Sequence, residues 1–403
     1  MKLRRLPEDF QVDEVTTVRP DGGPFALYRL TKKSVGTPEA ISAIVERWNI
    51  QRKRLSYGGL KDRHAVTTQH VTIHNGPRKD LQLKTLEMEY LGQTQQPFTP
   101  AEIDANRFQL VLRDMNATEV ATATLALSEV QHSGLPNYFD DQRFGSLGQS
   151  GDWIAREWCL GNWERALWLA LADPHPNDSS SEKKQKQILG ELWGQWPECQ
   201  QTLDRSHRRS IVTFLSDKVK AGRPADFRGA LARVSVDLRG LYLSAYQSAI
   251  WNRLLNRLIE DICSDSQRRI YELKSGPATF PVNLDEVQLA ALRDLSVPLP
   301  SARIDRPEGQ IGELLDEILA AEKMELRLLR VKYPRDSFFS KGLRRAIIST
   351  KELSGSVAAD DLYEGRQKLT LKFVLPRGSY ATILVKRITG LALPNEELDD
   401  EPK

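Results

Sequence analysis

The chain has 403 residues, of which 40% are hydrophobic and 28% are charged, a balance that is typical of a folded globular protein and excludes a disordered one. Lys and Arg number 57 against 54 Asp and Glu, so the formal net charge of +3 does not by itself indicate a nucleic-acid partner, and local clusters of charge must carry any such claim. Three cysteines without a CxxC pair and six scattered histidines exclude a disulfide framework, and we expect no metal.

The start of the chain and its length set the broad class. Residues 1–9 contain no apolar segment and do not resemble a signal peptide, and no apolar run is long enough to span a bilayer. We therefore expect a cytoplasmic protein that does not associate with membranes. A chain of 403 residues is long for one core and predicts two domains, or one domain with a large insertion.

The first part of the chain predicts two strands and a helix. Residues 10–15 alternate apolar and polar side chains, and residues 25–30 predict a second strand after a turn. Thr37, Pro38 and Glu39 have the order of an N-cap, a first helical residue and an acid in the first turn. Apolar residues at helical spacing follow, so we expect an amphipathic helix that packs on a sheet.

The segment of residues 58–69, GGLKDRHAVTTQ, combines two glycines with a carboxylate between two cations, and a predicted strand at 71–74 follows it. Asp62, placed between Lys61 and Arg63, should stay ionised because nearby positive charge favours the charged form. An ionised Asp on a turn beside a strand is a candidate nucleophile, base or electrostatic stabiliser. The alternative is a turn Asp whose neighbours are solvated.

Residues 107–115 predict another strand. Asn116 and Glu119 then have the spacing of a capping box, and the helix that they open ends at Gly134. The loop of residues 136–145, PNYFDDQRFG, carries three aromatic side chains among hydrogen-bonding groups. Exposed aromatics in such a setting suit a planar ligand such as a base; the alternative is that they fill the core.

The composition changes near Gly151. Six of the eight tryptophans lie at residues 153–196, in a stretch that predicts helices broken by a polar loop at 173–181. Because four of them recur every five residues, they do not follow one helical face, and we interpret them as core and domain-interface packing. Helical patterns continue through residues 241–262.

Residues 327–345 are rich in Lys and Arg, interleaved with three aromatic residues against a single Asp. Such a stretch could follow a phosphate backbone, each contact adding to a salt-dependent affinity. A solvated basic face is the alternative.

The last part of the chain is again rich in predicted strands, as the first part is. Residues 369–375 alternate and predict a strand, and Ser379 can cap a closing helix. Residues 395–403 form an acidic tail that we expect to be disordered. Together the patterns predict an α/β protein in which one domain, at 1–150 and 341–394, is interrupted by a helix-rich insertion at 151–340.

Four stretches, taken together, resemble the TruD family of tRNA pseudouridine synthases. They are PEDFQVDE at 7–14, GLKDRHAVTTQ at 59–69, PNYF with QRFG within 136–145, and LPRGSYAT at 375–382. All four occur in the family's order and span the chain, with weaker matches at 106–108 and 246–248. A lone KD or NYF would mean nothing, and the specificity lies in the combination of the four stretches.

The resemblance implies a fold and an activity. The fold is an α+β catalytic domain around a mixed, mainly antiparallel sheet, at 1–150 and 341–394, interrupted by the family's TRUD insertion domain at 151–340. The activity is isomerisation of a uridine in tRNA, usually uridine-13, to pseudouridine, without a cofactor or a metal. We expect a monomer whose partner is tRNA.

The resemblance also assigns roles to individual residues. Asp62 falls on the catalytic aspartate, which attacks the nucleotide and lets the base leave, rotate and rejoin through C5. Phe10, Asn137 and Tyr380 fall on positions that contact the substrate, and Phe139 on one expected to stack on the target base. Stacking on an aromatic ring can return roughly 1–3 kcal/mol of the cost of taking a base out of its stack.

Arg4 and Lys61 complete the set of candidate substrate-site residues. Arg4 stands where the family commonly has Lys, and we expect it to keep the charge beside Asp62 and to grip its carboxylate with two prongs. Two further departures from the family are Asp140, where Gly is frequent, and Tyr380, where Phe is frequent. The first adds negative charge near a site for a polyanion, and the second keeps a ring that can stack.

Two other functions compete with an RNA-modifying enzyme. The first is an RNA-binding or chaperone protein that kept the fold and lost catalysis, against which the intact Asp62, Asn137 and Phe139 argue. The second is a hydrolase that acts on a small glycoside or nucleoside, with Asp140 or Asp141 as the second carboxylate such enzymes need. The lack of GxxxxGK[ST] spacing at residues 58–61 argues against a phosphate-binding NTPase.

Overall fold

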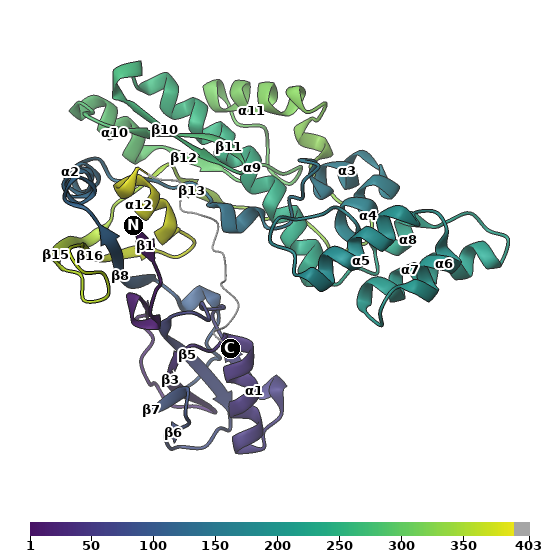
Figure 1. Ribbon diagram of the computed structural model, residues 1–403, viewed down its shortest axis with the longest axis horizontal. Coiled ribbons are helices and arrows are strands. Elements are labelled where there is room, and N and C mark those ends of the chain that lie inside the picture. Colours follow the sequence, from purple (N-terminus) through teal and green to yellow (C-terminus); the bar gives the residue numbers. More distant parts are fainter. Residues whose placement is uncertain (391–403) are drawn as a thin grey trace. The chain divides into compact units, whose positions relative to one another are not determined.

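The computed structural model describes residues 1–390, and the chain forms two compact units (Figure 1). Among the described residues, unit 1 consists of 1–136 and 347–390, and unit 2 consists of 137–346. The sequence places the boundaries at 150 and 340. The first division comes earlier because residues 137–144 already pack on helices and strands of unit 2. The acidic tail expected at 395–403 lies outside the described residues.

Unit 1 is built on a ten-stranded sheet with the order β15-β16-β8-β2-β5-β3-β7-β6, to which β1 adds on β8 and β4 on β5. Its strands are β1 (Lys2–Leu3), β2 (Phe10–Val15), β3 (Phe25–Lys33), β4 (Leu55–Tyr57), β5 (Val66–His74), β6 (Leu81–Gln82), β7 (Leu86–Thr94), β8 (Ala105–Met115), β15 (Lys351–Ala359) and β16 (Gln367–Pro376). β2 and β5 are parallel, and the other pairs of this sheet are antiparallel. The expectation of a mixed, mainly antiparallel sheet is confirmed.

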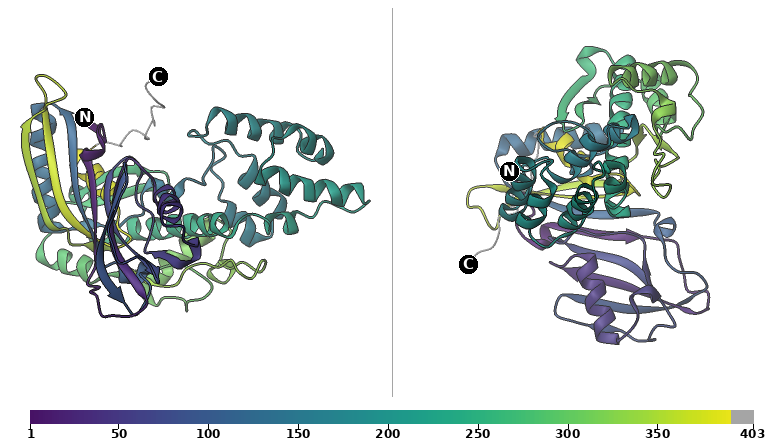
Figure 2. Two further views of the ribbon diagram at one scale, coloured as in Figure 1. Left: turned by 90° about the horizontal axis from the view of Figure 1, so that it is seen from below. Right: turned by 90° about the vertical axis from the view of Figure 1, so that its right-hand side faces the viewer.

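Helices cover the sheet of unit 1. They are α1 (Thr37–Trp48), α2 (Ala117–Ser133) and α12 (Ala381–Thr389). α1 places Ala40, Ile41 and Ile44 in a core cluster with residues of β3, β5 and β7, and α2 runs beside β15 and β16 (Figure 2). These contacts bury the apolar face of each helix, which is what stabilises it.

The helix caps follow the sequence in part. The predicted capping box of α2 is present, since Asn116 accepts from the amide of Glu119 at 2.8 Å, and Gly134 ends the helix. Two expected caps are wrong. Gly36 is the N-cap of α1, and Thr37 lies inside the helix with its hydroxyl bonded to Gln69. α12 begins after Tyr380, one residue later than the Ser379 cap expected.

Unit 2 is mostly helical. Its helices are α3 (Ile154–Leu160), α4 (Trp163–Leu171), α5 (Ser180–Glu191), α6 (Trp196–Thr202), α7 (His207–Lys220), α8 (Phe227–Leu231), α9 (Val236–Ile262), α10 (Glu286–Asp294) and α11 (Gly309–Ala321). β10 (Arg268–Leu273) pairs with β11 (Gly276–Pro281), and β12 (Ser296–Pro298) pairs with β13 (Leu343–Arg345). The 27-residue α9 contacts α3, α11, β11 and β12, and most of its residues are buried. It is the central helix of the unit.

The remaining short elements connect these parts. β9 (Leu135–Pro136) pairs with β14 (Ile347–Ile348) in unit 1. Short 3-10 helices are η1 (Pro7–Asp9), η2 (Arg52–Arg54), η3 (Pro100–Glu102), η4 (Asp141–Phe144), η5 (Asp265–Gln267) and η6 (Leu326–Leu328).

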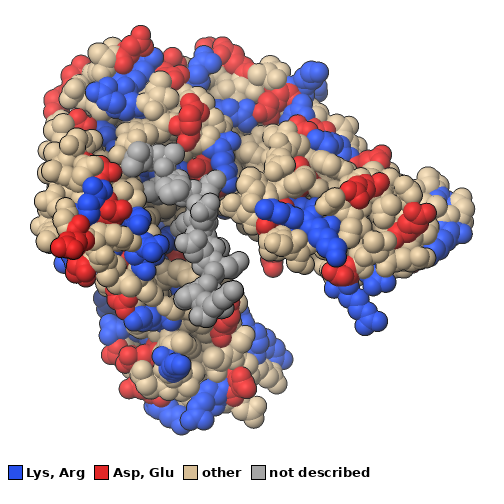
Figure 3. All heavy atoms as spheres, in the orientation of Figure 1, with Lys and Arg blue, Asp and Glu red and all other residues tan. Residues whose placement is uncertain are grey.

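The charged residues are mixed on the face shown in Figure 3, where Lys and Arg alternate with Asp and Glu over both units. This distribution agrees with the formal net charge of +3. Within residues 1–390, none of the helices is long and apolar enough to cross a membrane, and no three His, Cys, Asp or Glu residues gather as a metal site would need.

Candidate active site

Asp62 lies on the loop that joins β4 to β5, and its side chain is 46% exposed. The nearest Arg4 nitrogen, Nη2, stands 3.7 Å from Asp62 Oδ2. The structure therefore brings together the carboxylate and the cation that the sequence predicts as partners. Gly58 opens the loop where a Cβ would lie 2.5 Å from the side chain of Ile103, so this position needs glycine for close approach.

Arg4 is held between the carboxylate and an aromatic ring. Its guanidinium carbon lies 3.9 Å from the centroid of the Phe10 ring, a cation–π contact worth about 0.5–2 kcal/mol. Arg4 itself is in the left-handed region at φ 58°, which costs about 1–2 kcal/mol outside glycine. Because Phe10 is only 2% exposed, the ring supports Arg4 and is not an open platform.

The two segments meet because β2 and β5 are parallel. Gln11 is opposite Val66 in this pair, so both strands begin at the same edge of the sheet. The loops that lead into these two strands carry Arg4 and Asp62. The parallel register thus places residues that are far apart in the sequence beside each other.

The turn before β2 is anchored by a buried ion-pair cluster. Asp9, in η1, accepts from the backbone amide of Leu6 at 2.9 Å and from the guanidinium of Arg113 in β8. Arg113 also contacts Asp360 at 3.0 Å and Asp361 at 2.9 Å. Hydrogen bonding to these carboxylates, with Asp9 the largest contributor, raises the pKa of Arg113. The PED segment of the first motif therefore fixes the position of the chain between Arg4 and Phe10.

Lys61 points toward the sheet. Its ammonium group donates to Asn106 Oδ1 and lies 3.4 Å from Glu14 Oε2. Glu14 is buried and also accepts from the backbone amide of His70 at 2.8 Å. Lys61 is thus bound to protein groups, and its expected role in binding substrate stays a prediction.

Tyr380 lies in unit 1 as the half-buried N-cap residue of α12. The LPRGSYAT motif to which it belongs starts at the end of β16, where Leu375 is opposite Asn106 of β8. Since Asn106 accepts from Lys61, β8 connects this motif with the loop of Asp62.

Asn137 belongs to unit 2, where its side chain is tied to β13. Its Nδ2 donates to the carbonyl of Arg345 at 3.1 Å, and its Oδ1 accepts from Arg344 Nη2 at 2.7 Å. Arg344 also donates through Nε to the backbone carbonyl of Asn137 at 2.8 Å. Both ends of the amide are engaged with protein, so contact with a uracil edge stays a prediction.

Phe139 is also in unit 2 and is 7% exposed. The guanidinium carbon of Arg344 lies 4.1 Å from its ring centroid, and the ring packs edge-on against Trp251. Asn252 of α9 bonds both the amide and the carbonyl of Phe139, at 2.9 Å and 2.8 Å. Tyr138 and Phe144 of the same loop are fully buried, so the loop's aromatics fill the core, as the alternative interpretation holds.

The structure reveals anchoring residues that sequence reasoning missed. Lys32 of β3 is 1% exposed and donates to the backbone carbonyl of Asp62 at 2.7 Å. Thr37 accepts from the amide of Lys61 at 3.0 Å, and Gln69 binds Thr37. Strand alternation could have indicated Lys32, since it follows Tyr28 and Leu30 on the buried side of β3.

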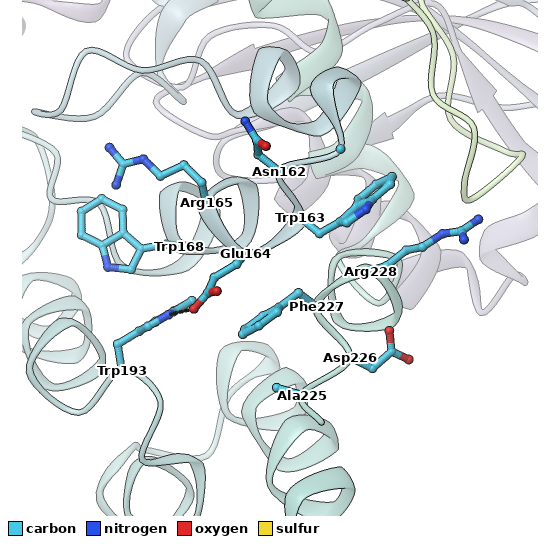
Figure 4. Close-up of a pocket in the computed structure, with 11 residues that line it drawn as sticks. Asn162, Trp163, Glu164, Arg165, Trp168, Trp193, Ala225, Asp226, Phe227 and Arg228 are labelled. Atoms are coloured by element: carbon cyan, nitrogen blue, oxygen red, sulfur yellow. Dashed lines mark hydrogen bonds between the residues drawn. The ribbon is translucent and has the colours of Figure 1, made fainter. Parts of the chain in front are cut away.

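Unit 2 also contains an open groove of about 740 Å³ (Figure 4). Trp163 and Trp168 of α4 line it together with Trp193 and Phe227, whose ring planes are 8° apart with centroids separated by 6.5 Å. Trp158, in contrast, is buried. The expectation of core packing therefore holds for Trp158 but misses the partly exposed faces of the groove tryptophans, because a five-residue step across two helices does not show which side reaches the surface.

Comparison with known proteins decides the family. Residues 1–388 match the family "tRNA pseudouridine synthase D (TruD)". The chain belongs to the TruD family. A Methanococcus maripaludis protein named "Probable tRNA pseudouridine synthase D 1" is 31% identical over 97% of this chain and 100% of its own length. A Methanocaldococcus jannaschii protein named "Probable tRNA pseudouridine synthase D 2" is 30% identical over 96% of this chain and 91% of its own.

A solved structure supports the fold. The crystal structure of a protein from Methanosarcina mazei, described as "Putative tRNA pseudouridine synthase D (TruD)", superimposes with a TM-score of 0.73 at 24% identity, over 97% of this chain and 93% of that one. The TruD family is a family of isomerases. The family and the fold class predicted from the four motifs are both confirmed.

Proposed function

We propose that this TruD-family chain isomerises a uridine in tRNA to pseudouridine, with Asp62 as the nucleophile. The observation that carries the proposal is the half-exposed carboxylate of Asp62 set 3.7 Å from Arg4. Unit 1 is then the catalytic domain and unit 2 the inserted domain. Uridine-13 is the target we propose on the family resemblance, and a tRNA substrate would be met in the cytoplasm.

The proposed isomerisation needs a carboxylate that can reach the nucleotide. Isomerisation breaks the bond between N1 and C1′ and forms one between C5 and C1′; the C5 proton leaves to solvent and N1 gains a proton. Attack of the Asp62 carboxylate on C1′ would break the N1–C1′ bond and hold the sugar while the base turns, and bonding of C5 to C1′ would release the carboxylate again. Arg4 supplies the opposite charge beside the carboxylate, and its packing on Phe10 keeps it in place.

For unit 2 we propose contact with the RNA backbone through the basic segment 327–345. Its exposed cations are Arg327, Arg330, Lys332, Arg335, Lys341 and Arg345, and the Phe338 side chain is 62% exposed. The single acid of the segment, Asp336, is paired with Arg239 at 2.7 Å. Arg344 differs from its neighbours, because its guanidinium is bound to Asn137 and Phe139.

The test is release of tritium from C5-labelled uridine in unmodified tRNA transcripts. We expect release with the wild type and none with Asp62→Asn, while the affinity for tRNA changes little. Asp13→Asn, which changes an exposed carboxylate on β2, is the control and should keep the wild-type rate. A transcript with cytidine in place of uridine-13 should release no tritium, because the proposed target is then absent.

Other outcomes would favour the competing functions. Binding of tRNA without release by the wild type would indicate an RNA-binding protein that lost catalysis. Free uracil in the products would indicate a hydrolase. Full release by Asp62→Asn would remove the role proposed for Asp62.

A further inference from the structure

Lys32 is a buried lysine whose ammonium group donates to three backbone carbonyls. They are the carbonyls of Asp62 at 2.7 Å, Val35 at 2.8 Å and Lys61 at 3.2 Å. An ammonium group has three donors, and these three carbonyls account for all of them. Two of the three belong to the consecutive residues at the tip of the candidate loop.

The strand that carries Lys32 is paired on both edges. β3 lies between β5 and β7 in the sheet, and Lys32 is opposite Thr67 on one side and Leu86 on the other. A side chain that starts from a strand paired on both edges places its terminal group more accurately than one that starts from a loop.

A second set of bonds fixes the same loop from α1 and β5. Thr37 accepts from the Lys61 amide at 3.0 Å and donates to Gln69 Oε1 at 2.9 Å. Gln69 in turn donates to the carbonyl of Gly59 at 3.2 Å. The backbone of residues 59–62 is therefore bound on both its donor and its acceptor groups.

From this arrangement we infer that Lys32 is a positioning residue for Asp62, holding the loop so that the carboxylate stands beside Arg4. The inference rests on the proposed function of Asp62. The Lys32 ammonium does not bond the carboxylate; it acts through the peptide groups on either side of Cα. A displacement of about 1 Å in a reacting group can cost on the order of 100-fold in rate, which is the scale at which such a clamp matters.

The protonation of Lys32 should affect the hold on the loop. Burial lowers the pKa of Lys32 to about 8, against the opposite effects of the Asp62 and Glu39 carboxylates, while Lys61 adds to the lowering. Above this pH the group loses one donor, so at least one of the three carbonyls is left without its hydrogen bond.

The experiment compares Lys32→Met with Lys33→Met in the full-length protein. Lys33 is the neighbouring residue of β3, is exposed, and pairs with Glu8, so it serves as a matched control. We expect Lys32→Met to lower kcat for tritium release by roughly 10- to 100-fold with KM changed less than about threefold, and Lys33→Met to behave as the wild type. The ratio of kcat for Lys33→Met to kcat for Lys32→Met should be largest below pH 8 and should shrink above it.

Thr37→Val provides a second route if Lys32→Met does not fold. It removes the acceptor of the Lys61 amide while nearly keeping the shape of the side chain, and it should also lower kcat more than KM. A folded Lys32→Met protein with kcat within twofold of Lys33→Met would overturn the inference, as would an unfolded one combined with unchanged kcat in Thr37→Val. Either result leaves the role of Asp62 intact if Asp62→Asn is inactive, and full activity of Asp62→Asn would instead remove the proposed function.

Discussion

Replacing Arg113 with Met should destabilise unit 1 by several kcal/mol. Arg113 is 5% exposed and bridges Asp9 and Asp360, whose side chains are 1% and 0% exposed. Methionine would fill similar space but leave two buried carboxylates without their cation. Removing one partner of a buried ion pair costs about 3–5 kcal/mol. The backbone amides that still bond each carboxylate favour the lower end of this range.

The matched control is Arg107→Met on the same strand. Arg107 and Glu352 are both exposed and lie 3.3 Å apart, and a surface pair of this kind contributes about 0–1 kcal/mol. Urea unfolding followed by circular dichroism gives the difference in the free energy of unfolding. Hydrogen exchange of the peptide covering residues 1–15 reports the local effect, because η1 should open when Asp9 loses Arg113.

The loss of stability in Arg113→Met should depend on pH. Burial raises the pKa of Asp360, but the amides of Asp114 and Leu362 and the guanidinium of Arg113 outweigh it and hold the pKa below its ordinary value. This carboxylate therefore stabilises the native state above its unfolded pKa, and that contribution is lost as the pH falls through the folded pKa. Without Arg113 the pKa of Asp360 rises, so the deficit of the variant should shrink between pH 7 and pH 4. A deficit no larger than that of Arg107→Met, or one that grows in acid, would refute the reasoning.

Two further predictions concern the proposed RNA function. Arg4→Met should lower kcat at least tenfold while Arg4→Lys keeps most of it, because the charge beside Asp62 is what the site needs; measurement of kcat for tritium release checks both, and Arg5→Met, on an exposed neighbour, is the control. Arg335→Gln combined with Lys341→Gln should weaken tRNA binding and reduce the slope of log affinity against log salt by roughly 0.7–0.9 for each phosphate that the variant no longer neutralises; an unchanged slope would contradict binding of the RNA backbone by this segment.

Local sequence patterns were enough to predict many helices and strands of unit 1. The alternation of residues 10–15 gave β2 with its bounds, and the Asn116–Glu119 pair gave the start of α2. Thr37 shows where local chemistry fails. Its sequence context is that of an N-cap, yet its hydroxyl is used by Gln69 and by the loop of Asp62, and only the tertiary arrangement shows this.

The sequence singled out the candidate site residues but not the residues that hold them in place. Motif resemblance singled out Asp62, and the proximity of Arg4 followed from it. The anchoring role of Arg113 depends on Asp9 and Asp360, which are separated from it by 104 and 247 residues, and no spacing rule links them. The burial of Phe139 could not be decided either, since a loop aromatic can face water or the core until α9 is placed beneath it.

The central position of β2 has a consequence for synthesis of the chain. β2 joins the strands β15, β16 and β8 on one side to β5, β3, β7 and β6 on the other, although it precedes all of these strands in the sequence. Its neighbour β8 is made about 100 residues later, and β16 follows only after the whole of unit 2. At about 5–20 residues per second, the roughly 200 residues of unit 2 delay β16 by about 10–40 s. During that time the edge of β8 that β16 will cover is open for pairing with other chains. A nascent chain arrested within unit 2 would contain β1 to β8 but lack β15 and β16, and a chaperone that covers exposed strands would have its longest opportunity there.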